Sequence, residues 1–128
     1  MFEKARNSKQ QGDIGLGYAI AYFTKEGYTV CVPLTDSQEY DLVVENGTLL
    51  RVQVKTTSHR NKYGSFEVQL VTKGGNQSWG GVSKKLDRSK VDAIFALTSE
   101  GDQYFIPCSA FEGNLSITVT KKYKDYKI

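Results

Sequence analysis

Two runs of strand-forming residues flank the triplet Asn46-Gly47-Thr48, and this arrangement restricts the possible folds more than any other feature of the chain. The runs cover residues 40–45 and 49–57, and both are rich in Val and Leu. The Asn-Gly pair favours the positive φ angles that a tight turn requires, so the sequence predicts a β-hairpin. Such a hairpin brings Asp41, near the start of the first strand, beside Gln53 and Lys55 of the second.

The rest of the chain predicts one helix before this hairpin and several elements after it. Apolar residues at 16, 19, 20 and 23 recur at helical spacing, and Ser8 and Gln11 have the spacing of a capping box. Further strands are expected over residues 28–34, 66–72, 91–98, 103–108 and 116–120, with a glycine-rich loop over 73–81 and a short helix over 82–90. This order predicts an α+β domain with a mixed sheet. A length of 128 residues suits one domain, so we expect residues 1–128 to form a single unit.

Composition excludes several classes of protein. With 39% hydrophobic and 24% charged residues, the chain is neither disordered nor collagen-like. No apolar run approaches the roughly 20 residues of a membrane span, so we expect no membrane partner. The first residues lack the apolar stretch of a signal peptide, which predicts a cytoplasmic location.

Charge is concentrated in the middle of the chain. Residues 51–90 contain nine Lys or Arg against Glu67 and Asp87, whereas the net charge of the whole chain is +3. A basic segment within a nearly neutral protein is typical of polyanion binding, most often to nucleic acid. The alternative is a basic face that is only solvated.

The second hairpin strand carries polar side chains on one face. Strict alternation places Arg51, Gln53 and Lys55 on one side, and Val52 and Val54 on the other. An aspartate in the neighbouring strand is unexpected, because Asp is depleted in strands. The oxygens of Asp41, Gln53 and a backbone carbonyl suit a hard divalent cation, and a nearby lysine can orient or deprotonate water. The alternative is a surface ion pair between Asp41 and Lys55.

Several segments resemble the PD-(D/E)xK nuclease superfamily. They comprise residues 9–15, the helix after them, and residues 27–30, 40–44 and 51–56. Their order is closest to the small branch that contains Holliday-junction resolvases and a group I intron homing endonuclease. The resemblance covers about residues 8–57, with weaker support from 91–95 and 104–107. It implies a restriction-endonuclease-like α+β fold: an αβββαβ core with a central mixed sheet flanked by helices.

The resemblance also implies a Mg²⁺-dependent (or Mn²⁺-dependent) endonuclease that hydrolyses phosphodiester bonds in DNA. By position, Asp41 and Gln53 bind the metal with the backbone carbonyl of Val54, and Lys55 is the catalytic lysine. Gln53 replaces the usual acid, as is known in the homing-endonuclease branch. Leu16 stands where many relatives have a metal-binding glutamate, and Asp13 is a further candidate ligand one turn earlier.

The residues expected to contact DNA are Arg51, His59, Arg60, Lys62, Lys84, Lys85 and Arg88. Relatives in this branch act as dimers or tetramers, so a homodimer or homotetramer is expected. Because of Leu16, a catalytically silent DNA-binding module with the same fold is the main alternative. A protein-interaction domain without a nucleic-acid role is the third hypothesis.

Overall fold

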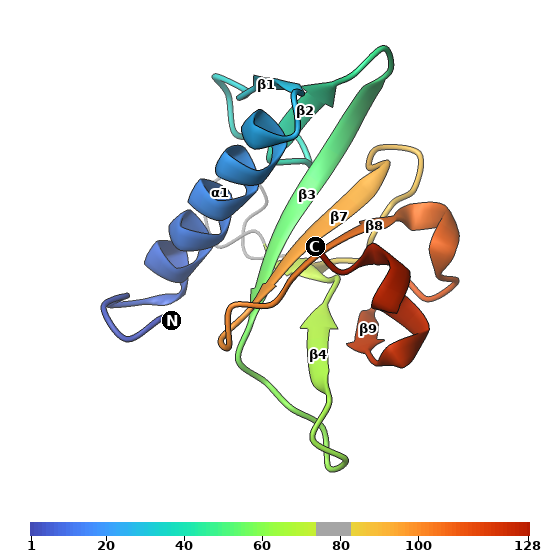
Figure 1. Ribbon diagram of the computed structural model, residues 1–128. Helices are drawn as coiled ribbons and strands as arrows, with labels where there is room; N and C mark the ends of the chain where they lie inside the picture. The colour runs from blue at the N-terminus through green and yellow to red at the C-terminus, as the bar shows by residue number, and fades with distance from the viewer. Residues whose placement is uncertain (74–82) are drawn as a thin grey trace.

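The computed structural model describes residues 1–73 and 83–128. In these two ranges, one helix, α1, precedes nine strands and two short 3₁₀ helices (Figure 1). The bounds are α1 Ser8–Lys25, β1 Thr29–Cys31, β2 Leu42–Glu45, β3 Leu49–Thr57, β4 Phe66–Gln69, β5 Thr72–Lys73, β6 Ser83–Lys84, β7 Ala93–Thr98, β8 Gln103–Pro107, η1 Cys108–Ala110, β9 Ser116–Val119 and η2 Lys121–Tyr126.

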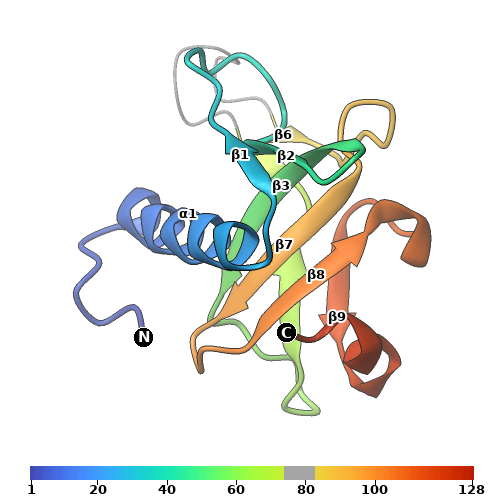
Figure 2. The ribbon, with the colours of Figure 1, turned by 45° about the horizontal axis from the view of Figure 1, so that its top comes forward.

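The central sheet has five strands in the order β1-β2-β3-β7-β8. Strands β3 and β7 run parallel, and the other neighbours in this sheet are antiparallel. Figure 2 shows this twisted sheet with α1 lying across one face. The mixed sheet with its helix confirms the α+β, restriction-endonuclease-like fold class. Within the described residues, no helix has the length and apolarity needed to span a membrane.

Two apolar clusters lie on opposite faces of the sheet. Alternation along β7 sends Phe95 and Leu97 into the cluster under α1, where they join Phe23 and Leu42. The intervening Ile94 and Ala96 belong to the second cluster. That cluster is closed by a small antiparallel sheet of β4 and β9. Because both faces are covered, β7 is buried along its whole length.

The predicted hairpin is confirmed. Glu45 pairs with Leu49 across the turn, and Gly47 adopts a φ of +84°.

The start of α1 differs from the prediction, because Asn7 rather than Ser8 is the N-cap. Its side chain accepts a hydrogen bond from the backbone N–H of Gln10. The Gln10 side chain in turn accepts from the N–H of Arg6, the residue before the N-cap.

The helix predicted over residues 82–90 is wrong for the described residues 83–90. Ser83 and Lys84 form β6, which pairs with β5, and the segment turns at 87–90. Leu86 is buried, and its N–H donates to the carbonyl of Asn114. One apolar residue in this stretch gives too little helical periodicity to compete with such tertiary contacts. In the described part of the chain, the covering helix is therefore confined to one face of the sheet.

Gly15 allows α1 to lie close to β3. A Cβ at this position would stand 2.5 Å from Cγ2 of Thr56 and 3.3 Å from Cγ1 of Val54. Thr56 cannot rotate away freely, because it is β-branched and its hydroxyl accepts a hydrogen bond from Gln11. We expect Gly15→Ala to lower the free energy of unfolding by about 1–3 kcal/mol, measured by urea denaturation.

Gly12 is the matched control for this prediction. It lies in the same helix, but a Cβ added there meets no atom within 4 Å. Gly12→Ala is expected to raise the free energy of unfolding by about 0.5–1 kcal/mol, because alanine restricts the unfolded chain. Equal effects of the two substitutions would contradict the proposed close approach of helix and strand.

Candidate functional site

Asp41 lies where β3 extends past the start of β2. Its backbone N–H donates at 2.9 Å to the carbonyl of Val52, the residue that pairs with Leu42. Its side-chain Oδ2 accepts from the N–H of Val54 at 2.7 Å. The paired register of β2 and β3 begins with Leu42 opposite Val52, so Asp41 lies just outside it. The hairpin therefore brings Asp41 against Val54, which lies between Gln53 and Lys55 in β3.

The Val54 carbonyl points toward the same edge as Asp41. In a β-strand, the N–H and C=O of one residue face the same neighbour. The Val54 N–H faces Asp41, whereas the carbonyls of Arg51 and Thr57 face the β7 side and accept from Asp92 and Ser99. The Val54 oxygen is thus directed to the edge at which β2 has ended.

Gln53 and Lys55 lie on the face of β3 that is turned away from α1. Val54 and Thr56 occupy the opposite face, as their contacts with Gly15 show. The Gln53 side chain is buried, and its Nε2 donates to the carbonyl of Glu39 at 2.9 Å. This hydrogen bond fixes the orientation of the side-chain amide.

Asp41 and Lys55 both lie in surroundings that disfavour their charged forms. Asp41 as a whole residue is exposed, yet desolvation of its carboxyl group by the surrounding protein raises the pKa of that group. Desolvation outweighs the hydrogen bond from Val54 and the attraction of Lys55, both of which lower the pKa of Asp41. Desolvation also lowers the pKa of Lys55, against the attraction of Asp41. Such opposed shifts in adjacent groups are typical of functional sites.

The donor set at this edge fits a magnesium or manganese ion. Asp41, the Gln53 side chain and the Val54 carbonyl offer only oxygen atoms, the ligands that hard divalent cations prefer. Within residues 1–73 and 83–128, no group of three His, Cys, Asp or Glu side chains is placed to hold a metal. Mg²⁺ commonly uses one or two carboxylates and keeps several waters, so one aspartate with neutral oxygens is a chemically reasonable set.

Neither of the two helix positions considered for a further metal ligand, Asp13 and Leu16, adds one to this donor set. Leu16 is partly buried and packs against the cluster beneath α1, so it is a core residue. Asp13 is exposed and lies two positions from both Gln11 and Gly15, which contact β3. A separation of two residues is about 200° around a helix, so Asp13 projects from the opposite side.

Two polar residues that support the site were not identified from the sequence. Gln11 donates to the Thr56 hydroxyl at 3.0 Å and joins α1 to β3. Gln11 lies four and eight positions before Gly15 and Ala19, and this spacing indicates that it shares their helix face toward the sheet. Glu39 is the second residue: its carbonyl holds Gln53, and its carboxylate lies 3.7 Å from Lys84 and 3.9 Å from Lys90. No local pattern indicated these distant partners.

Three arginines of the basic segment have structural contacts. Arg51 makes a two-pronged ion pair with Asp92, which lowers the pKa of that carboxyl, and also donates to the Ser89 carbonyl. Arg88 donates to the carbonyls of Cys108, Phe111 and Gly113. Arg60 pairs with Glu100. Arg51 and Arg88 therefore stabilise the fold, and their contact with DNA stays a prediction.

The lysines and the histidine of the same segment are placed differently. His59, Lys62 and Lys85 are exposed, whereas Lys84 is half-buried beside Glu39. The glycine-rich loop expected over 73–81 lies, apart from Lys73, outside the described residues. His59, Lys62 and Lys85 are thus the predicted DNA contacts with the greatest access to a large ligand.

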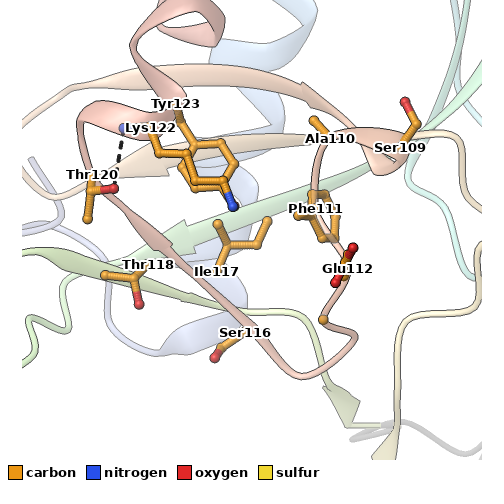
Figure 3. Close-up of a pocket in the computed structure, with 11 residues that line it drawn as sticks. Ser109, Ala110, Phe111, Glu112, Ser116, Ile117, Thr118, Thr120, Lys122 and Tyr123 are labelled. Atoms are coloured by element: carbon orange, nitrogen blue, oxygen red, sulfur yellow. Dashed lines mark hydrogen bonds between the residues drawn. The ribbon is translucent and has the colours of Figure 1, made fainter.

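A recess of about 640 Å³ lies away from these residues, between η1, β9 and η2 (Figure 3). Phe111, Tyr123 and Ile117 line it together with the hydroxyls of Ser116 and Thr118. None of the residues predicted for the metal site or for DNA contact lines this recess. The candidate site lies instead on β3, beside the start of β2.

Comparisons with known proteins agree with this geometry. The sequence profile of a family described as PD-(D/E)XK endonuclease matches residues 6–128. The fold is similar to the solved structure of a bacterial homing endonuclease, with 28% identity and a TM-score of 0.76. That match covers 94% of this chain and 88% of the other. No protein with a curated description matches the chain significantly. The resemblance inferred from residues 8–57 is confirmed.

Proposed function

Because the chain belongs to the PD-(D/E)XK endonuclease family, we propose that it is a metal-dependent DNA endonuclease, homing-endonuclease-like or junction-resolvase-like. The observation that supports the proposal is the hydrogen bond from the Val54 N–H to the Asp41 side chain, because Val54 lies between Gln53 and Lys55 in β3. We further propose that residues 1–128 form one nuclease domain in the cytoplasm. A homodimer or homotetramer would supply the two centres needed to cut both strands.

In this proposal, Asp41, Gln53 and the Val54 carbonyl hold Mg²⁺ or Mn²⁺. When bound, the metal acts as a Lewis acid toward the phosphate and its attacking water. Asp41 contributes the negative charge, and Glu39 fixes Gln53 so that its amide oxygen is presented in one orientation. Lys55 orients the attacking water and accepts or shares its proton, a role that its lowered pKa favours.

His59, Lys62 and Lys85 are proposed to contact the DNA backbone outside the metal site. Lys84 and Arg60 contribute positive charge there while keeping their partners Glu39 and Glu100. Backbone contacts of this kind set the register of the duplex without reading its sequence.

A silent DNA-binding module is the second candidate function. Leu16 favours it, because this side chain packs into the core where relatives carry a glutamate. Metal and cleavage assays separate the two functions. The endonuclease requires a divalent ion for cleavage, and EDTA is expected to abolish it while DNA binding persists. The silent module binds DNA with the same affinity in Mg²⁺ and in EDTA and cuts under neither condition.

Gln53→Glu tests the metal site directly. The change restores the acid usual in relatives, so we expect about tenfold tighter Mn²⁺ binding by calorimetric titration and cleavage at the wild-type rate or faster. A buried carboxylate also loses the hydrogen bond that Gln53 donates to Glu39, so the metal-free variant should unfold at a lower temperature. Added Mn²⁺ should then raise its Tm more than that of the wild type.

Gln69→Glu is the control for the added charge. Gln69 is exposed on β4, in the smaller sheet. Its substitution should leave Mn²⁺ affinity unchanged. The same affinity in wild type, Gln53→Glu and Gln69→Glu would exclude Gln53 from the metal site.

A further inference from the structure

The connection between β3 and β4 ends in an ordered loop, residues 60–65. The Asn61 side-chain oxygen accepts hydrogen bonds from the N–H groups of Tyr63, at 2.9 Å, and Ser65, at 3.1 Å. The backbone N–H of Asn61 also donates to the Ser65 carbonyl at 2.9 Å. Gly64 adopts a φ of +82°, which allows the chain to reverse. These contacts fix the backbone of a short surface loop.

Arg60 attaches this loop to the body of the protein. Its guanidinium donates to the Gly64 carbonyl at 2.7 Å and stacks 3.9 Å from the centre of the Phe66 ring. It also pairs with Glu100, in the turn between β7 and β8. Among the described residues, Glu100 is the only acid paired with Arg60, and this ion pair neutralises its charge.

The fixed loop presents a cation and an aromatic ring to solvent. Tyr63 is 80% exposed, and the Nζ of Lys62 lies 5.2 Å from the centre of its ring. Figures 1 and 2 both show the loop projecting beyond the sheet, between β3 and β4. A large ring held at the tip of an ordered loop contributes little to the core. It is ready to bind without the entropy cost of ordering a flexible segment.

We propose that residues 60–65 enter a groove of the DNA duplex beside the cleavage site, with Lys62 at a phosphate and Tyr63 against sugar and base edges. This proposal rests on the proposed function. Lys62 lies seven positions after Lys55, so its Cα is at most about 25 Å from that of Lys55. At about 3.4 Å per base pair, the contact falls within about seven base pairs of the cut. The loop therefore contacts base pairs that flank the cut.

The test measures binding of a labelled duplex of mixed sequence by fluorescence anisotropy, in EDTA and over a range of salt concentrations. Lys62→Ala should reduce the slope of log affinity against log salt by about 0.9, because one counterion-releasing contact is lost. Tyr63→Ala should weaken binding roughly tenfold at every salt concentration with the slope unchanged, because an uncharged contact is lost. Tyr63→Phe should retain most of the affinity.

Tyr18→Ala and Lys25→Ala are the matched controls. Both residues are exposed on α1, and neither belongs to the proposed site or loop. They should bind DNA as the wild type does. Urea midpoints equal to that of the wild type establish that Lys62→Ala and Tyr63→Ala are folded, as expected for two exposed side chains.

The outcomes distinguish the two proposals. If the wild type binds DNA and both loop variants match its affinity and salt slope, the loop proposal is overturned while the proposed function stands. If the wild type binds no DNA, both are overturned. If Tyr63→Ala alters only the sedimentation behaviour, the loop is a contact between copies of the chain, and its role in DNA binding is overturned.

Discussion

Replacing Asp41 with asparagine is expected to lower the single-turnover cleavage rate by at least about a thousandfold, because this change removes the carboxylate of the proposed metal site. Asparagine has the same shape, and its side-chain oxygen can still accept the hydrogen bond from the Val54 N–H. The hairpin geometry is therefore retained. DNA binding in EDTA should be equal or tighter, since a negative charge beside the phosphates is lost.

Stability provides an independent readout for the same variant. The raised pKa of Asp41 means that the folded state binds the proton more tightly than the unfolded state does. Between the unfolded and folded pKa values, this carboxyl therefore makes stability fall as pH rises, and above both values the full penalty is present. An asparagine side chain is never charged, so the Asp41→Asn variant should be no less stable than the wild type at pH 7. We expect its Tm, measured by calorimetry, to be equal or higher.

Asp36→Asn is the charge-matched control. Asp36 is exposed in the same β1–β2 connection, but it does not lie at the hairpin edge. Its substitution should leave the cleavage rate unchanged. Cleavage by Asp41→Asn at the wild-type rate would exclude the proposed site.

The site was predictable from the sequence because its geometry is local. A three-residue turn is enough to bring Asp41 beside β3 at Val54, and two-residue alternation sets Gln53 and Lys55 on one face of that strand. The helix phase likewise predicted that Leu16 packs in the core. Each of these inferences needed only neighbours within a single hairpin or helix.

Long-range pairing explains what the sequence did not reveal. Arg51 and Asp92 are 41 positions apart, and they meet only because β3 and β7 lie side by side. Arg88 binds three carbonyls around η1, which no spacing rule anticipates. A basic segment identified by counting charges therefore included side chains that stabilise the fold. The pairing of Ser83 and Lys84 with β5 also has no local signal in the sequence. Residues 83–90 were therefore predicted to be helical.

Lys55→Ala is expected to lower the cleavage rate by about 10²–10⁴, the usual contribution of a positioned proton-transfer group. The structural reason is that desolvation lowers the pKa of Lys55 although Asp41 lies nearby and opposes the shift. A larger fraction of the amine is thus neutral near pH 7 than for an exposed lysine. The wild-type rate should rise with pH up to the lowered pKa, because the neutral amine accepts the proton of the attacking water.

Lys55→Arg separates proton transfer from simple charge. A guanidinium remains charged at every accessible pH and attracts phosphate as the ammonium does, but it cannot accept a proton. We therefore expect Lys55→Arg to bind DNA with wild-type affinity and yet cleave almost as slowly as Lys55→Ala, with the rise in rate with pH reduced. Lys121→Ala, at an exposed position in η2, controls for loss of one positive charge and should cleave normally. If Lys55→Arg restored the wild-type rate, Lys55 would act only by neutralising phosphate charge, and the water would have to lose its proton to another group.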